Sequence, residues 1–446
     1  MSILVVELAW FGIALLLFRL CRPRIAVLAA SLGGWILLPV GSYPAGSSDP
    51  LFPYWIVGLA LPSDMLVSKA WVAPVSALLG VLAFDREAMR GRRPGWVDAP
   101  VVLWCLWPLA AAGFADGPRP AAWLASLYLI GTWGVPWCLG RLYLGSAEAR
   151  LLLIKALALS GLACLPFGLI EGLLGPSLYG TVFGTPHPFR HDGDVRYIGF
   201  RPIGFFEHGN QFGLWISLCA LAGLWLAHST PPSERRLWRG AAAVLMVMAL
   251  AAQSIGALLL LAIGATALSV FGRISPRLLL AGAGVLLALG GVVYVSGVIP
   301  MERIARDTAI GRELVSVVRA AGRGSLTWRV AQDQKLLKTA TAHPVAGTSH
   351  WDWWRAEGSR PWGLTLLVLG QYGAMGLLLV LTVLLLPTVA VAGSAGTASA
   401  WRPDGLGLLM ATLLVLSVFD ALLNAFIFFP ALLVAGAVAR DVPRDG

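Results

Sequence analysis

Arginine and histidine side chains are concentrated in two long polar segments, residues 176–209 and 300–362, of a chain that is otherwise apolar. A guanidinium binds phosphate through two parallel hydrogen bonds, and an imidazole exchanges protons near neutral pH. The second segment carries ten arginine and lysine residues against six carboxylates. These residue types predict a site that holds a pyrophosphate and stabilises the charge that develops when it leaves.

The elements that must position these side chains are membrane helices. The 446 residues are 58% hydrophobic and 13% charged, with a mean hydropathy of +0.77. A spanning helix needs roughly 20 apolar residues, and the chain supplies about a dozen such runs. We therefore expect an all-α, polytopic integral membrane protein with about 12–13 transmembrane helices in a single membrane domain, residues 1–446. This composition excludes soluble enzymes and single-pass anchors.

Short basic loops orient the predicted helices, because such loops stay in the cytoplasm. Their arginines are Arg19, Arg22 and Arg24, then Arg86, Arg90, Arg92 and Arg93, then Arg235, Arg236 and Arg239, and finally Arg273 and Arg277. The expected spans are 2–20, 25–43, 66–84, 97–115, 121–141, 151–175, 209–227, 238–252, 255–271, 278–298, 363–391, 404–420 and 422–439. This topology predicts that 176–209 and 300–362 are periplasmic loops, the larger one lying before the third-last helix.

Within the larger loop, Trp328–Ala342 alternates apolar and charged positions at a helical period, which predicts an amphipathic helix. Proline at 344 ends it, because proline disfavours helix at the preceding residue. The following run, GTSHWDWWRAEGSRPWG, is rich in tryptophan and arginine. Its tryptophans are interpreted either as membrane-interface residues or as part of a site. Glu171 and Asp420 are ionisable residues in apolar runs, which by default indicates function. For Glu171, pairing with an arginine of the polar loops is the alternative to catalysis.

The sequence lacks the motifs of several classes of enzyme. The sequence has no GxxxxGK[ST] phosphate loop, no GxSxG and no HExxH, and its cytoplasmic loops are too short for a nucleotide-binding domain. The five cysteines are not arranged as CxxC or paired with histidines, so neither a disulfide framework nor a metal site is expected. We expect no cofactor, no metal and no nucleic-acid partner.

Four segments together carry a resemblance to a known family. RYIGFRPIGFFEHGNQFG resembles the family pattern R-x-x-G-x-F-x-x-x-N, with Arg201, Gly204, Phe206 and Asn210 in the matching positions. The other three are AQSIGALLLLAIG (252–264), GRGSLTWRVAQDQKLLKTATAHPVAG (322–347) and LTLLVLGQYGAMGLL (364–378). In order and spacing this set resembles the O-antigen ligase and polysaccharide polymerase superfamily over roughly residues 150–440.

The resemblance implies a metal-independent, GT-C-like glycosyltransferase in the bacterial inner membrane, with its active site facing the periplasm. Such an enzyme moves a glycan from undecaprenyl pyrophosphate, without nucleotide, onto another lipid-linked repeat unit (polymerase) or onto lipid A core (ligase). Its partners would be the undecaprenyl-pyrophosphate-linked oligosaccharide, membrane lipids, and a chain-length regulator and flippase. The products of a polymerase would be an exopolysaccharide, a capsule or O-antigen.

Two positions differ from the family pattern. Ile255 replaces the arginine that usually follows Ser254, and RPWG, ending at Gly363, stands where the family has a His-Asn pair. The missing His-Asn pair favours a polymerase over a ligase. It leaves His343 or His350 to act in place of the histidine, or Arg355 and Arg360 to bind the phosphate, and His350 is the general-base candidate. A non-catalytic assembly partner and a transporter of lipid-linked sugars remain alternatives. A transporter would be expected to show paired repeats with broken midplane helices.

The candidate residues follow from these patterns. The expected catalytic residues are Arg201, Arg323, His350 and Glu171. The residues expected to bind pyrophosphate or glycan are Arg196, His208, Asn210, Arg329, Arg355 and Arg360. Asn210 is also expected to cap the helix that begins near 209, because asparagine favours that position.

Overall fold

The computed structural model describes residues 3–40, 67–90, 94–114, 122–175, 178–187, 195–296, 307–320, 324–394, 400–424 and 429–439. Arg323, one of the expected catalytic residues, lies outside them. The described part of the chain consists of helices and the loops between them, and it has no strand beyond one isolated bridge between Val195 and Phe200. The expectation of an all-α fold is confirmed.

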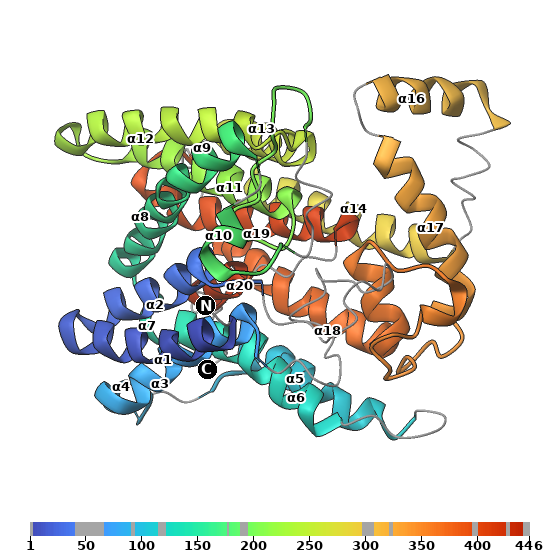
Figure 1. Cartoon of the computed structure of the whole chain (residues 1–446), viewed down its shortest axis with the longest axis horizontal. Helices are drawn as coiled ribbons and strands as arrows, with labels where there is room; N and C mark the ends of the chain where they lie inside the picture. Colours follow the sequence, from blue (N-terminus) through green and yellow to red (C-terminus); the bar gives the residue numbers. More distant parts are fainter. Residues whose placement is uncertain are drawn as a thin grey trace.

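Each of the thirteen expected spans contains at least one helix (Figure 1). The first half of the chain forms α1 (Ile3–Leu20), α2 (Pro23–Leu37), α3 (Lys69–Phe84), α4 (Glu87–Arg90), α5 (Ala99–Ala111), α6 (Ala122–Leu129), α7 (Val135–Tyr143), α8 (Ala147–Ala163), α9 (Leu165–Leu174) and α10 (Leu178–Phe183). The second half forms α11 (Gly209–Ser229), α12 (Pro232–Ala251), α13 (Ile255–Val270), α14 (Pro276–Ser296), α16 (Ala309–Ala320), α17 (Gly324–Ala340), α18 (Leu364–Ser394), α19 (Leu406–Leu423) and α20 (Phe429–Val438).

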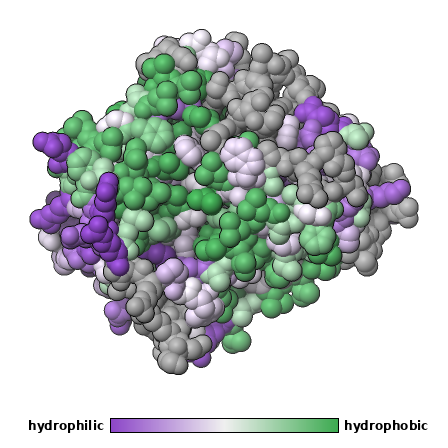
Figure 2. All heavy atoms as spheres, turned by 90° about the horizontal axis from the view of Figure 1, so that it is seen from below, coloured by the Kyte–Doolittle hydropathy of each residue, from purple (hydrophilic) through white to green (hydrophobic). Residues whose placement is uncertain are grey.

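Seven helices or joined helix pairs among the described residues are long and apolar enough to cross a membrane. Figure 2 shows apolar side chains over the middle of one face, with hydrophilic side chains towards its two ends. This arrangement is favourable in a bilayer, because apolar side chains contact hydrocarbon while charged ones reach water. The protein is therefore a polytopic membrane protein.

The two ends of the bundle carry different elements. Figure 1 places α4 at one end, on the left, and α16 and α17 at the other, on the right. We call these the α4 end and the α17 end. Asp85, which follows α3, accepts a 2.8 Å hydrogen bond from the hydroxyl of Tyr143 in α7, so these two helix termini meet at the α4 end.

Helix α18 is interrupted at Gly373, where φ is +69°. A Cβ there would lie 2.2 Å from the carbonyl oxygen of Val345, so only glycine fits. The loop before α18 satisfies the interrupted backbone: Thr348 N donates to Gly370 O at 2.9 Å, and Ala374 N donates to Pro344 O at 2.8 Å. These hydrogen bonds on either side of the break therefore attach the tryptophan-rich loop to α18.

That attachment buries part of the loop. A Cβ on Gly370 would lie 2.1 Å from the indole ring of Trp353, so the indole lies directly against the helix backbone. Trp353 and Trp354 are buried and stack edge to face with ring centroids 5.7 Å apart. Trp353 is therefore a packing residue of the α17 end rather than a membrane-interface residue.

The expected amphipathic helix exists as α17, which ends at Ala340, before the His-Pro pair at 343–344. Leu336 and Ala340 are buried, whereas Lys335 and Lys338 are exposed. The buried face packs on α18, so α17 covers this end of the bundle.

Candidate functional site

Two arginines from distant segments meet at the α17 end through two asparagines. Arg201 Nη2 donates a short hydrogen bond to Asn210 Oδ1, and Asn210 Nδ2 donates to Asn424 Oδ1 at 3.3 Å. Arg329 Nη1 donates to the same Asn424 oxygen at 2.6 Å. We call these four residues the arginine–asparagine network. It joins the loop before α11, the start of α11, α17 and the end of α19.

Arg201 lies directly against the N-terminal turn of α11. Its side chain is fully buried, and a Cβ on Gly209 would lie 2.5 Å from its Nε atom. Gly209 thus allows the guanidinium to approach the helix backbone closely. The N-terminus of a helix carries roughly half a positive charge. The Arg201 guanidinium and the N-terminus of α11 are therefore two positive groups that lie side by side. Such a place favours an anion.

Arg329 and Arg360 both lie over the indole ring of Trp362. Their Cζ atoms are 4.8 Å and 4.6 Å from its centroid, a cation–π arrangement. The backbone N–H of Trp362 donates to Asp333 Oδ1 of α17 at 3.0 Å, which fixes the indole relative to α17. Arg201, Arg329 and Arg360, three residues that the sequence singled out, are therefore linked through shared contacts.

Asn424 ends α19 as its C-cap residue, and its backbone N–H donates to Asp420 O at 2.8 Å. Its side-chain Nδ2 donates to Asp420 Oδ1 at 3.0 Å. Asp420, the intramembrane carboxylate, is buried and orients the Asn424 amide so that the amide oxygen faces Arg329 and Asn210.

The N-cap of α11 is His208, not Asn210. His208 Nδ1 accepts a 3.0 Å hydrogen bond from the backbone N–H of Asn210, which satisfies one free donor of the first turn. The expectation that Asn210 caps this helix is wrong, because the histidine ring already occupies that role. The asparagine side chain turns instead towards Arg201.

Glu171 is buried at the end of α9, and its Oε2 atom accepts from the backbone N–H groups of Ile203 and Gly204, at 2.7 Å and 2.6 Å. The sequence left open a pairing of Glu171 with a loop arginine. The contacts described for it are instead with the backbone of the segment that carries Arg201.

The remaining expected residues do not join the network through any described contact. Arg196 is exposed, and its backbone N–H donates to Gly199 O at 2.9 Å in a turn. Arg355 lies 3.3 Å from Asp352 and over the ring of Trp351. His350 is half-buried in the loop attached to α18, where its backbone N–H donates to Thr348 Oγ1.

Sequence reasoning missed two groups beside the network. Lys69 of α3 is fully buried; its Nζ atom lies 3.4 Å from Glu207 Oε2 and donates to Phe205 O at 2.7 Å. Gln253, between α12 and α13, holds the loop 197–200 through its amide group. A lysine at the edge of an apolar run is the signal that could have been followed for Lys69. Gln253 gave no such signal.

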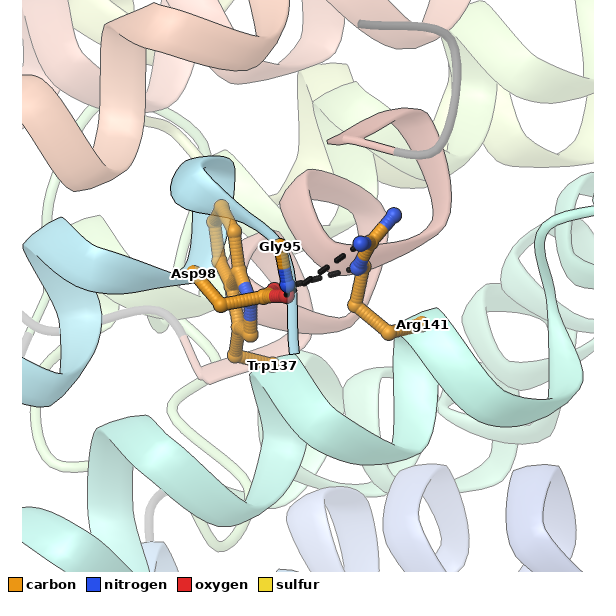
Figure 3. Close-up of polar contacts among 4 residues, drawn as sticks. All are labelled: Gly95, Asp98, Trp137 and Arg141. Atoms are coloured by element: carbon orange, nitrogen blue, oxygen red, sulfur yellow. Dashed lines mark hydrogen bonds and ion pairs between the residues drawn. The ribbon is translucent and has the colours of Figure 1, made fainter. Parts of the chain in front are cut away.

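A separate cluster at the α4 end surrounds one arginine, Arg141, which lies two residues before Tyr143 in α7. Figure 3 shows its contacts. Arg141 of α7 donates to Asp98 through Nε at 3.0 Å and Nη2 at 3.2 Å. Asp98 also accepts from Trp137 Nε1 and from the backbone N–H of Gly95, each at 2.8 Å. The same carboxylate therefore neutralises the arginine and receives four hydrogen bonds. We call these four residues the Asp98 cluster.

Among the described residues, no three His, Cys, Asp or Glu side chains converge as metal ligands would. No protein-family model matches the chain, and no curated protein matches it either.

Proposed function

We propose that this protein is a membrane glycosyltransferase that polymerises undecaprenyl-pyrophosphate-linked repeat units of an exopolysaccharide, capsule or O-antigen. In this proposal it acts in the bacterial inner membrane, the α4 end faces the cytoplasm and the α17 end faces the periplasm. The sequence resemblance supplies the substrate class. The arginine–asparagine network is the structural feature that supports it.

The single observation that carries the proposal is the linkage of Arg201, at the start of α11, to Arg329 through Asn210 and Asn424. Asn210 and Asn424, which link the two guanidiniums, are amides and bring no negative charge of their own. Positive charge from two side chains and a helix N-terminus is thus gathered where an anion can be held. A pyrophosphate linked to a polyprenyl chain in the bilayer matches both the charge and the position of this network.

The reaction makes one bond and breaks one. A hydroxyl of the acceptor glycan attacks the anomeric carbon of the donor, and the bond between that carbon and the pyrophosphate oxygen breaks. The hydroxyl proton passes to a base, for which the sequence offers His350. Arg201 and Arg329 stabilise the negative charge that grows on the departing lipid pyrophosphate.

The proposal is tested with the purified full-length protein, a lipid-pyrophosphate oligosaccharide and mass spectrometry of the products. We expect longer lipid-linked glycans without added nucleotide. Arg329→Ala should lower extension by about 100-fold, the typical loss when one group that stabilises transition-state charge is removed. Arg402→Ala is the matched control, because Arg402 is an exposed arginine before the other end of α19. Equal activity of Arg329→Ala and wild type would overturn the assignment of the site.

The alternatives give different products in the same assay. A ligase would extend no lipid-linked chain but would transfer the glycan to added lipid A core. A transporter would move the intact donor across a vesicle membrane, and an assembly partner would do neither. The linked arginines favour the enzyme, because a leaving pyrophosphate needs such charge at a fixed place.

A further inference from the structure

The loop that carries Arg201 is held along its backbone by buried side chains from four separate elements. These are Gln253 after α12, Glu171 of α9, Lys69 of α3 and His187 after α10. They contact backbone groups of residues 197–206. A buried loop needs partners for its backbone N–H and C=O groups, and here buried side chains of other elements supply them.

The contacts fall on both sides of Arg201. Before it, Gln253 Oε1 accepts from the N–H groups of Tyr197 and Ile198, and its Nε2 donates to Phe200 O at 3.2 Å. Gln253 is itself held at a φ of +51°, a backbone conformation that non-glycine residues rarely adopt. The amide is therefore oriented at some cost in backbone strain, as at many functional sites.

After Arg201, three side chains hold four consecutive residues. Glu171 accepts from Ile203 and Gly204 N–H, Lys69 donates to Phe205 O, and His187 Nε2 donates to Phe206 O at 2.8 Å. All three side chains are buried, Glu171 being only 1% exposed. Gly204 has a φ of +61°, so the chain turns sharply at the point that Glu171 holds.

We propose that Glu171 is a positioning residue that fixes the 203–204 turn, and with it the guanidinium of Arg201, rather than an acid or base that exchanges a proton with substrate. The proposal rests on the proposed function only for the role of Arg201. A single oxygen, Oε2, accepts both hydrogen bonds. A glutamine can place its amide oxygen there, whereas a leucine of similar size cannot accept at all.

This geometry gives a matched pair of variants, Glu171→Gln and Glu171→Leu. The first readout is hydrogen–deuterium exchange of the 201–206 backbone in the full-length protein, which needs no substrate. We expect exchange of this segment to be about 10-fold faster in Glu171→Leu, because two backbone hydrogen bonds are lost, and close to wild type in Glu171→Gln. Unchanged exchange in Glu171→Leu would overturn the positioning role.

The second readout is chain extension at a series of pH values. A positioning role predicts that Glu171→Gln loses less than about threefold in rate and keeps the wild-type pH profile, while Glu171→Leu loses at least tenfold. An acid or base role predicts instead that both variants lose activity equally and that exchange in Glu171→Gln is normal. That pattern would overturn the proposal.

Gln253→Met supplies a second test in case Glu171→Leu does not fold. Methionine matches glutamine in length but neither accepts from nor donates to the 197–200 backbone. We expect faster exchange there and a moderate loss of extension. If the wild type extends no chains while the exchange results hold, the proposed function fails and the positioning of Arg201 stands.

Discussion

Arg141 and Arg201 are two mostly or fully buried arginines at opposite ends of the bundle, and they have contrasting partners. Arg141 makes a two-bond pair with the Asp98 carboxylate, which also holds Trp137 and Gly95 (Figure 3). Arg201 contacts an asparagine amide and the N-terminal turn of a helix. A carboxylate neutralises the charge of a guanidinium, whereas the described contacts of Arg201 are with an uncharged amide and a helix N-terminus.

The comparison separates two uses of arginine in one chain. In the Asp98 cluster, the carboxylate neutralises the charge of Arg141 within the fold. This ion pair joins the start of α5 to α7 and stabilises the α4 end. In the arginine–asparagine network, the described hydrogen bonds fix two guanidiniums through uncharged amides. Under the proposed function, this second arrangement binds an anionic ligand.

The largest expected difference is between Arg201→Ala and Arg141→Ala. Arg201→Ala should lower chain extension per folded molecule by about 100-fold or more. Arg141→Ala should instead destabilise by about 1–3 kcal/mol, because Asp98 loses two hydrogen bonds, with normal activity per folded molecule. The measurements are product lengths by mass spectrometry and thermal unfolding in detergent. An Arg141→Ala protein that stays folded but is inactive would contradict the distinction between the two arginines.

Asn210→Asp should make the network resemble the Asp98 cluster. The new carboxylate would pair with Arg201 and, in the first turn of α11, would contribute about 0.3–1 kcal/mol through the helix dipole. We expect a higher unfolding temperature and pyrophosphate binding weakened about 10-fold, since an internal anion competes with the ligand. Calorimetric titration with inorganic pyrophosphate measures the binding. Tighter binding in Asn210→Asp would contradict this use of the network.

The reverse exchange, Asp98→Asn, serves as the control for that variant. It removes the charge that neutralises Arg141 and should lower the unfolding temperature, with pyrophosphate binding at the α17 end unchanged.

Salt should affect the two regions unequally. Raising ionic strength from 0.05 M to 0.5 M shortens the screening length from roughly 14 Å to 4 Å and should weaken pyrophosphate binding several-fold. The two bonds of Arg141 with Asp98 are short and partly buried, so the thermal stability they give should change little. Binding that is independent of salt would show that the network does not hold the anion by charge.

The smallest expected effect concerns a partly exposed pair near the start of α12. Lys155 Nζ donates to Glu234 Oε2 at 2.7 Å, and this hydrogen bond lowers the pKa of the Glu234 carboxyl below its ordinary value of 4.5. A lowered pKa means that the stability it contributes is present above about pH 4.5 and is lost as the pH falls through the lowered pKa. Lys155→Met should therefore lower the unfolding temperature slightly at pH 7, and this effect should shrink as the pH falls below 4.5 through the lowered pKa of Glu234.

Much of the architecture could be predicted from the sequence. The apolar runs are long enough that the bilayer dictates helices, and each expected span contains one. The end of α17 before the proline at 344 follows from local sterics. The break in α18 at Gly373 could not be predicted, because it depends on the loop 343–349 supplying backbone partners from outside the helix.

The site could be predicted only in part. Arg201, Arg329 and Arg360 stood out by charge in polar loops, and the structure links them. Asn424 and Gln253 did not stand out, because an amide near a helix end has many local uses and its partner is far away in the chain. Glu171 was found by its position in an apolar run, but its contacts with backbone N–H groups were not.

The sequence by itself determined that this protein lies in a membrane, where its helices run and at which loops its positive charge gathers, because hydrophobic length and charge are local properties. The tertiary structure alone decided which arginine meets a carboxylate and which meets an amide. Asp98 lies 43 residues from Arg141, and Asn424 lies 95 residues from Arg329. Such pairings depend on helix packing, because only packing brings side chains this far apart in the sequence into contact.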